Sequence, residues 1–300
     1  MPRIVIAENL GIYPDQIERL KKLGVLTTFS EPLKSSDEWL ERCRGHDIIC
    51  SGKLGLKEKV YDLSDVFISV PFVAVDWIDK KKIKEKNITI ANSPGCNKDA
   101  VSEWIIGMMI NLSRKFPEHM NTKKRLLIED RDKGLTGKKI CILGRGNIGS
   151  RVGEICRSFD MDVTHFKRGD DILECIKDSD YVIDCLGSNE STYNILDKRF
   201  FGSLKKGSYF VTVTGMKICD YDSMLEALDA GILAGAATDA GGIQVGDTDD
   251  PFYRKLVNHE RLIVTPHIAY RTDVTARVAN DMMIDNIEAW LKGKPINIVN

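Results

Sequence analysis

Three glycines, Gly144, Gly146 and Gly149, follow an apolar run that ends at Leu143. Their spacing is GxGxxG, and apolar residues then recur at helical spacing from Ile148 onward. A strand, a tight turn and a helix start in this order favour binding of a pyrophosphate, because glycine permits close backbone approach and the helix start offers free N–H groups. The pattern predicts a dinucleotide site. The alternative is a glycine-rich turn that only packs.

The end of the next strand-like segment indicates which dinucleotide is bound. In such units an acid about 20 residues after the glycines commonly bonds the ribose 2′-hydroxyl. Here "VTHFKRGDD" places Lys167 and Arg168 at that position. Two cations can hold a 2′-phosphate by charge-assisted hydrogen bonds, so NADP(H) is favoured over NAD(H). Asp170 and Asp171 follow closely, which leaves open a solvated loop without preference for either cofactor.

The hydrophobic pattern along the chain supplies a scaffold for these residues. Short β-branched runs alternate with amphipathic segments from end to end, which is typical of parallel sheets with crossover helices. We expect a first α/β unit up to about residue 95, a long helix over 99–116, a second α/β unit, and a last helix over about 271–292 that returns to the first unit. The polar span 117–136 is expected to be helix plus loop. The predicted fold class is α/β, with two Rossmann-like, doubly wound parallel-sheet domains.

Composition excludes several classes of partner. The 300 residues carry a net charge of −1, so no long-range field attracts the chain to nucleic acid or to an anionic membrane. The first residues lack a long apolar segment, and no stretch of about 20 residues is free of charge, so we expect a cytoplasmic protein without a membrane anchor. The eight cysteines show neither CxxC nor zinc-site spacing, and we expect no metal.

Six segments carry a resemblance over essentially the whole chain: "NSPGCNKDAVSEW", "GKKICILGRGNIGSRV", "SNESTYNILDKRFFGSLKKG", "VTVTGMKICD", "GAATDAGG" and "VTPHIAYRT". In this order and spacing they resemble the D-isomer-specific 2-hydroxyacid dehydrogenases. The resemblance implies a substrate domain made of 1–98 plus 269–300, and an inserted dinucleotide-binding domain of 99–268. It also implies hydride transfer to or from a small-molecule substrate in a cleft between the domains, and a homodimer.

The family's catalytic set is an arginine, a glutamate and a histidine, and only the histidine has a counterpart here. His267 in "TPHIA" matches it, and an imidazole suits proton exchange with a carbonyl or hydroxyl oxygen near neutral pH. Thr214, Gly215, Met216 and Lys217 stand where the family has A-R-G-G, and Gly242 takes the place of the glutamate. We therefore expect an NAD(P)-dependent oxidoreductase with altered substrate chemistry and doubtful activity on ordinary 2-oxo acids.

The remaining candidate site residues fall into three groups. Asp239 matches the family aspartate that meets the nicotinamide carboxamide; the alternative is a strand-end residue bonded to a local turn. The expected cofactor-binding set is Gly144, Arg145, Gly146, Asn147, Ile148, Gly149, Lys167, Arg168, Leu186, Val213, Thr214 and Asp239. The substrate candidates are Lys53, Lys217 and Arg271 as replacement cations, with Phe72, Val73 and Ala74 in a rebuilt substrate loop. Glycine at 215, 241 and 242 is interpreted as removing bulk beside the nicotinamide.

Two other functions remain open from the sequence. The absence of the arginine and the glutamate suits a protein that binds NADP(H) as a sensor or partner without turnover. It also suits reduction of an imine, or of another substrate without a carboxylate, although nothing in the chain identifies such a molecule.

Overall fold

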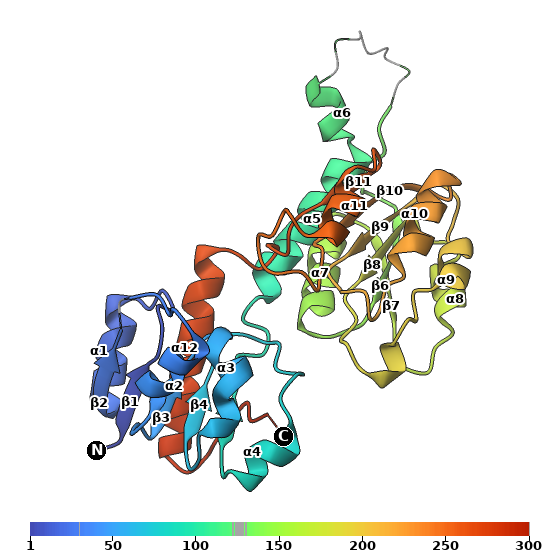
Figure 1. Cartoon of the computed structure of the whole chain (residues 1–300). Helices are drawn as coiled ribbons and strands as arrows, with labels where there is room; N and C mark the ends of the chain where they lie inside the picture. The colour runs from blue at the N-terminus through green and yellow to red at the C-terminus, as the bar shows by residue number, and fades with distance from the viewer. Residues whose placement is uncertain (30, 122, 124–128, 130, 300) are drawn as a thin grey trace. The chain divides into compact units, whose positions relative to one another are not determined.

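The computed structural model describes residues 1–29, 31–121, 123, 129 and 131–299. The chain divides into two compact units (Figure 1): unit 1 comprises Met1–Asn97 and Arg271–Asn300, and unit 2 comprises Lys98–Tyr270. None of the helices in the described ranges has the length and apolar character that a membrane span requires.

Unit 1 is built on a five-stranded sheet of order β2-β1-β3-β4-β5, and every pair of neighbouring strands is parallel. Its elements are β1 (Arg3–Ile6), α1 (Pro14–Leu23), β2 (Val25–Thr28), α2 (Ser36–Cys43), β3 (Ile48–Cys50), α3 (Leu54–Lys59), β4 (Phe67–Ser69), α4 (Lys80–Glu85), β5 (Thr89–Ala91) and α12 (Asp273–Leu291). The central strands β3 and β4 are buried along their whole length, because both faces of the sheet are covered. In β1, Ile4 and Ile6 pack with α1 and α12, whereas Val5 packs with α2 and α3.

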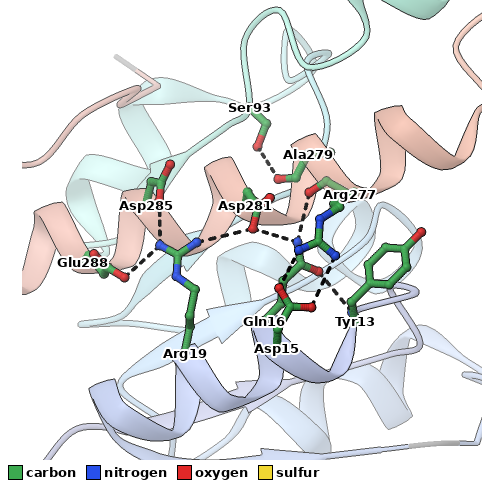
Figure 2. Close-up of polar contacts among 10 residues, drawn as sticks. All are labelled: Tyr13, Asp15, Gln16, Arg19, Ser93, Arg277, Ala279, Asp281, Asp285 and Glu288. Atoms are coloured by element: carbon green, nitrogen blue, oxygen red, sulfur yellow. Dashed lines mark hydrogen bonds and ion pairs between the residues drawn. The ribbon is translucent and has the colours of Figure 1, made fainter.

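A polar network joins α1 to α12, so that the two ends of the chain form one unit (Figure 2). The fully buried Gln16 donates from Nε2 to Asp281 Oδ1 at 2.8 Å and to the Arg277 carbonyl oxygen at 3.0 Å. Arg19 extends the network, because its Nη2 donates to Asp285 Oδ1 at 2.7 Å. A buried amide with both of its groups bonded fixes the pairing of these helices more specifically than apolar contact alone.

Replacing Gln16 with leucine is expected to destabilise unit 1. The substitution leaves the Tyr13 N–H, which now bonds Gln16 Oε1 at 3.1 Å, without its partner, and removes one of the bonds to the Arg277 carbonyl, which lies within α12. A polar group left unsatisfied costs about 1–3 kcal/mol, so we expect a loss of about that size in the free energy of unfolding. The measurement is urea unfolding followed by tryptophan fluorescence.

Tryptophan fluorescence reports mainly on unit 1, because Trp39, Trp77 and Trp290 lie in it. The matched control is Glu18→Ala on the same helix, since Glu18 forms an exposed pair with Lys21. An exposed pair contributes little, about 0.2–1 kcal/mol. Equal unfolding midpoints for the Gln16 and Glu18 variants would contradict the assigned role of the network.

Unit 2 is built on a six-stranded sheet of order β11-β10-β9-β8-β6-β7, also parallel throughout. Its elements are α5 (Lys98–Ser113), α6 (Phe116–Asn121), β6 (Lys139–Leu143), α7 (Asn147–Ser158), β7 (Asp162–Phe166), α8 (Ile172–Ile176), β8 (Tyr181–Asp184), α9 (Lys198–Gly202), β9 (Ser208–Thr212), α10 (Tyr221–Asp229), β10 (Leu233–Thr238), α11 (Pro251–Val257) and β11 (Leu262–Val264). Helices α5 and α7 cover one face, and α8 to α11 contribute to the core on the other. The strand order reverses between β6 and β8, and ligands of such sheets bind outside the carboxyl ends at that switch point.

The predicted fold class is confirmed, and the differences lie at helix ends. The helix expected over 99–116 begins at Lys98 and ends at Ser113. It stops early because Lys115 takes a left-handed conformation, with φ of 47°, which breaks the helical hydrogen-bond pattern. The helix plus loop expected over 117–136 falls partly outside the described residues.

Candidate functional site

The glycine turn between β6 and α7 has the geometry that a dinucleotide needs. Gly144 has φ of +98°, which favours glycine, and a β-carbon on Gly149 would lie 2.3 Å from the Gly144 carbonyl oxygen. A β-carbon on Gly146 would meet no atom within 4 Å. The first glycine therefore makes the turn, the third allows close packing of the helix, and the second leaves open space for a phosphate.

The first turn of α7 presents free donors toward that space. Its N-cap residue, Gly146, has no side chain to bond the helix N–H groups. The first bond within the helix runs from the Ser150 N–H to the Gly146 carbonyl oxygen at 2.9 Å. The N–H groups of Asn147, Ile148 and Gly149 thus precede the helical ladder, as an anion site requires.

The two cations at the end of β7 lie directly beyond Phe166. Both are exposed, and no carboxylate in the described part of the chain lies within ion-pair distance of either. The Lys167 N–H donates to Asp170 Oδ2 at 2.9 Å, so Asp170 closes the turn. Arg168 Nη2 lies 3.5 Å from Ser191 Oγ. Lys167 and Arg168 are therefore available to an anionic ligand.

The ends of β8 and β9 hold a buried acid that the sequence analysis did not select. Asp184 is fully buried; its Oδ2 accepts from Thr212 Oγ1 at 2.8 Å and from Thr214 Oγ1, and its Oδ1 accepts from the Leu186 N–H at 3.1 Å. Burial raises the pKa of this carboxyl to about 6, against the lowering effect of these hydrogen bonds. The sequence did offer a signal for this residue, because Asp184 is an acid at the end of an otherwise apolar strand.

This network uses the polar groups of Thr214, which was expected to bind the cofactor. Besides the bond to Asp184, its carbonyl accepts from Tyr221 Oη at 2.7 Å and its N–H donates to Thr212 Oγ1 at 3.1 Å. Leu186 and Val213 lie next to the same strand ends, and the Val213 N–H bonds the Asp184 carbonyl at 3.4 Å. The predicted cofactor contacts of these three residues stay predictions.

His267 lies in a loop after β11 and its ring is oriented by a backbone carbonyl. Its φ is +56°, and its Nδ1 lies 3.1 Å from the Ile243 carbonyl oxygen. A carbonyl only accepts hydrogen bonds, so Nδ1 carries a proton and Nε2 is the atom left for exchange. Ile243 follows Gly242, the residue at the place of the family's glutamate. Sequence reasoning could not find this contact, because a carbonyl leaves no side-chain signal.

Asp239, at the end of β10, holds the same loop. It is buried, its Oδ1 accepts from Thr265 Oγ1 at 2.5 Å and from the Ile268 N–H at 2.8 Å, and its Oδ2 accepts from the Ala269 N–H at 2.8 Å. These bonds bracket His267 on both sides, so Asp239 fixes the backbone that carries the imidazole. The carboxylate retains acceptor capacity, and its contact with a nicotinamide carboxamide stays a prediction.

Gly215 and Gly241 do not leave space, contrary to the interpretation from sequence. They form an isolated parallel bridge, and a β-carbon on Gly241 would lie 3.0 Å from the Gly215 nitrogen and from the Thr214 carbonyl oxygen. A β-carbon on Gly215 would lie 3.1 Å from the Gly241 carbonyl oxygen. The two backbones lie close together here, so any side chain at 215 would require the Gly241 carbonyl to move by a few tenths of an ångström. Gly242 differs: its φ of +104° requires glycine, and space is available beside it.

The substrate candidates are divided between the two units. In unit 1, Lys53 Nζ lies 5.2 Å from the centroid of the Phe72 ring, a cation–π contact near the carboxyl ends of β3 and β4. In the same loop as Phe72, Val73 and Ala74 are exposed, and the Val73 carbonyl accepts from Asn92 Nδ2 at 2.7 Å. The two remaining cations, Lys217 in unit 2 and Arg271 in unit 1, are both exposed. The substrate roles of all of these residues stay predictions.

The parallel sheet, the glycine turn and the histidine loop together define an α/β dinucleotide-binding oxidoreductase. Residues 106–269 match the family model described as "D-isomer specific 2-hydroxyacid dehydrogenase, NAD binding domain". The chain belongs to this family.

Similar sequences and solved structures are consistent with membership of this family. D-lactate dehydrogenase of Staphylococcus aureus (strain MRSA252) is 26% identical over 287 residues, which cover 84% of this chain and 85% of that protein. An acyclic imino acid reductase in complex with NADPH and D-Arg has a TM-score of 0.84 at 21% identity, over 99% of this chain and 100% of the other. The D-lactate dehydrogenase TP0037 from Treponema pallidum has a TM-score of 0.78 at 22% identity, over 100% of both chains. At such identities the solved structures show the fold.

Family membership fixes the class of reaction. Members are NAD(P)-dependent dehydrogenases and reductases that act on CH–OH or C=O groups, and this protein is an oxidoreductase of that class. The alternative of a sensor without turnover is not favoured by these relatives.

Proposed function

We propose that the protein is an NADP(H)-dependent reductase that moves a hydride between nicotinamide and a carbonyl carbon, with His267 exchanging the proton. The observation that supports this best is the contact of His267 Nδ1 with the Ile243 carbonyl oxygen at 3.1 Å. It leaves Nε2, and not Nδ1, for proton exchange with a reacting oxygen. Asp239 stabilises the loop that presents the ring.

Different residues would bind different parts of the cofactor. The open space at Gly146 and the first N–H groups of α7 would receive the pyrophosphate, and Lys167 and Arg168 the 2′-phosphate. When bound, the nicotinamide supplies or accepts the hydride. His267 Nε2 donates a proton to the substrate oxygen during reduction and accepts one during oxidation. No carboxylate in the described ranges lies within 4.0 Å of its ring nitrogens, so a carbonyl dipole takes the orienting role of the missing glutamate.

The cofactor preference provides the first test. We expect NADPH to bind more tightly than NADH, and the double variant Lys167→Ala, Arg168→Ala to lose that difference. Each charge-assisted bond to a phosphate contributes about 1.5–3 kcal/mol, so the Kd for NADPH should rise about 10²-fold or more. NADH lacks the 2′-phosphate and should be affected less than about threefold. Fluorescence titration of both nucleotides measures the four constants.

The control for this titration is Lys177→Ala, because Lys177 is a cation of the same region that pairs with Glu174. It should leave both constants unchanged. Equal affinities for NADPH and NADH in the wild type, or an equal loss of both in the double variant, would contradict the 2′-phosphate role.

A second candidate substrate is an imine carbon. The observation that favours it is Gly215, which stands where the family has the arginine that polarises a carbonyl and whose backbone pairs with that of Gly241. A protonated imine carries its own positive charge and needs no such cation. The similarity in fold to an acyclic imino acid reductase, whose structure contains NADPH and D-Arg, also supports an imine substrate.

NADPH oxidation with a panel of aldehydes, ketones and 2-oxo acids, run with and without ammonium or methylamine, tests both substrates. Turnover that requires the amine, with an amine or amino acid as product, selects the imine; amine-independent turnover selects the carbonyl. Absence of turnover under either condition between about pH 6 and 9 would reject the proposed function.

The remaining proposals concern organisation. We propose that unit 1 is the substrate domain and unit 2 the dinucleotide-binding domain, because unit 2 contains the glycine turn. A homodimer in the cytoplasm remains the expected state, and size-exclusion chromatography with light scattering tests the dimer.

A further inference from the structure

Asp184 lies at the edge of the sheet where the cofactor is proposed to bind. Its register partners are Leu143, the last residue before the glycine turn, and Thr212 at the end of β9. The carbonyl oxygen of the next residue, Cys185, would lie 3.0 Å from a β-carbon on Gly144. Asp184 is therefore at the switch point of the sheet, and its partner Leu143 directly precedes the glycine turn.

The charge of this carboxylate has no counter-charge among the residues that the structure describes. The groups that bond it are two hydroxyls and an N–H, and no cation appears among its interactions in the described residues. The titratable groups that face it are Cys185 on its own strand, Cys219 after β9 and Tyr221 at the start of α10. Burial raises the pKa of all three, so each is neutral at pH 7. An uncompensated charge in a low-dielectric interior favours a nearby cation.

We infer that Asp184 makes the cofactor site prefer the oxidised nicotinamide, whose ring is cationic, over the neutral reduced ring. The inference rests on the proposed function, which places a nicotinamide nucleotide at this edge. It extends that function by assigning a residue to the balance between the two redox forms. The same carboxylate would stabilise the positive charge that develops on the ring as hydride leaves.

Proton linkage gives the inference a signature that a purely structural role lacks. Asp184 is partly protonated near its pKa of about 6. A cationic ring favours the ionised carboxylate, so binding of NADP⁺ releases protons in that pH range, whereas binding of NADPH releases fewer. Lowering the pH through 6 protonates the carboxyl and weakens NADP⁺ relative to NADPH. The 2′-phosphate also titrates near pH 6, but both forms carry it, so its contribution cancels in the comparison.

The experiment is calorimetric titration of NADP⁺ and NADPH between about pH 5 and 8, in two buffers of different ionisation enthalpy. For the wild type, the ratio Kd(NADP⁺)/Kd(NADPH) should rise at least about fivefold from pH 8 to pH 5, a typical size for coupled binding. In Asp184→Asn the ratio at pH 8 should be raised by a similar factor and should depend less on pH than in the wild type; the same pair compared in a His267→Asn background removes the imidazole that the proposed function places beside the ring. Asp180→Asn is the matched control: Asp180 lies before the same strand, at its other end, paired with Lys205.

Thr214→Val gives a second variant in case Asp184→Asn does not fold. It removes a hydroxyl that lowers the pKa of Asp184, so the pH of maximal proton release should move upward. A ratio that is independent of pH in the wild type and unchanged in Asp184→Asn would overturn the inference while the proposed function stands. If folded protein binds neither nucleotide, both fail.

Discussion

Replacing His267 with asparagine is expected to lower kcat by about 10²- to 10⁴-fold and to leave the Kd for NADPH within about twofold of the wild type. Asparagine suits the site because it tolerates the left-handed backbone, with φ of +56°, that this position requires. Its amide can still donate to the Ile243 carbonyl, but it cannot exchange a proton near neutral pH. The loss should therefore appear in the chemical step and not in cofactor binding.

Single-turnover kinetics at saturating NADPH measure that step directly. His259→Asn is the matched control, because His259 contacts Asp229 and lies in the same unit. The control should retain the wild-type rate. If His267→Asn turned over as fast as the wild type, another group would exchange the proton and the role proposed for His267 would be wrong.

The glycine turn was predictable because its constraints are local. A strand that ends at Leu143 and a helix that begins at Asn147 leave three residues for the turn. The conformation of Gly144 and the packing of Gly149 follow from glycine alone, without knowledge of distant residues. The cations at 167 and 168 could be selected by their spacing from this turn.

The network of Asp184 could not be predicted because it depends on register between strands. Asp184 and Thr212 are partners across β8 and β9, and the chain alone does not state which residues become partners. The same reason explains the error at Gly215 and Gly241. Sequence shows two missing side chains and suggests open space, whereas the bridge between them places backbone there.

The orientation of His267 illustrates a third limit. Its partner is the carbonyl of Ile243, and any residue type at 243 would supply the same atom. The sequence therefore indicated only that the glutamate was absent. The loop supplies a carbonyl that orients the ring in place of the glutamate. Asp239 fixes this loop, because its carboxylate accepts hydrogen bonds from the Ile268 and Ala269 N–H groups.

Adding one methyl group at Gly146 is expected to abolish tight cofactor binding without damaging the fold. A β-carbon there meets no protein atom within 4 Å, and φ is −78°, which alanine adopts freely. The methyl would occupy the space proposed for the pyrophosphate and hold it away from the N–H groups of α7. Loss of two hydrogen bonds to a charged group, each about 1.5–3 kcal/mol, predicts a rise in Kd of about 10²-fold or more for NADPH and NADH alike.

Two further glycines separate this effect from general disruption. Gly202→Ala should leave the affinity unchanged and should not lower the melting temperature, since a β-carbon at this exposed position in α9 also meets nothing within 4 Å and alanine favours a helix over glycine. Gly149→Ala should lower the melting temperature as well as the affinity, because its β-carbon would lie 2.3 Å from the Gly144 carbonyl oxygen. Calorimetric titration and thermal unfolding distinguish the three variants. A Gly146→Ala protein with wild-type affinity would show that the phosphates lie elsewhere, and the cofactor site proposed at this turn would have to be abandoned.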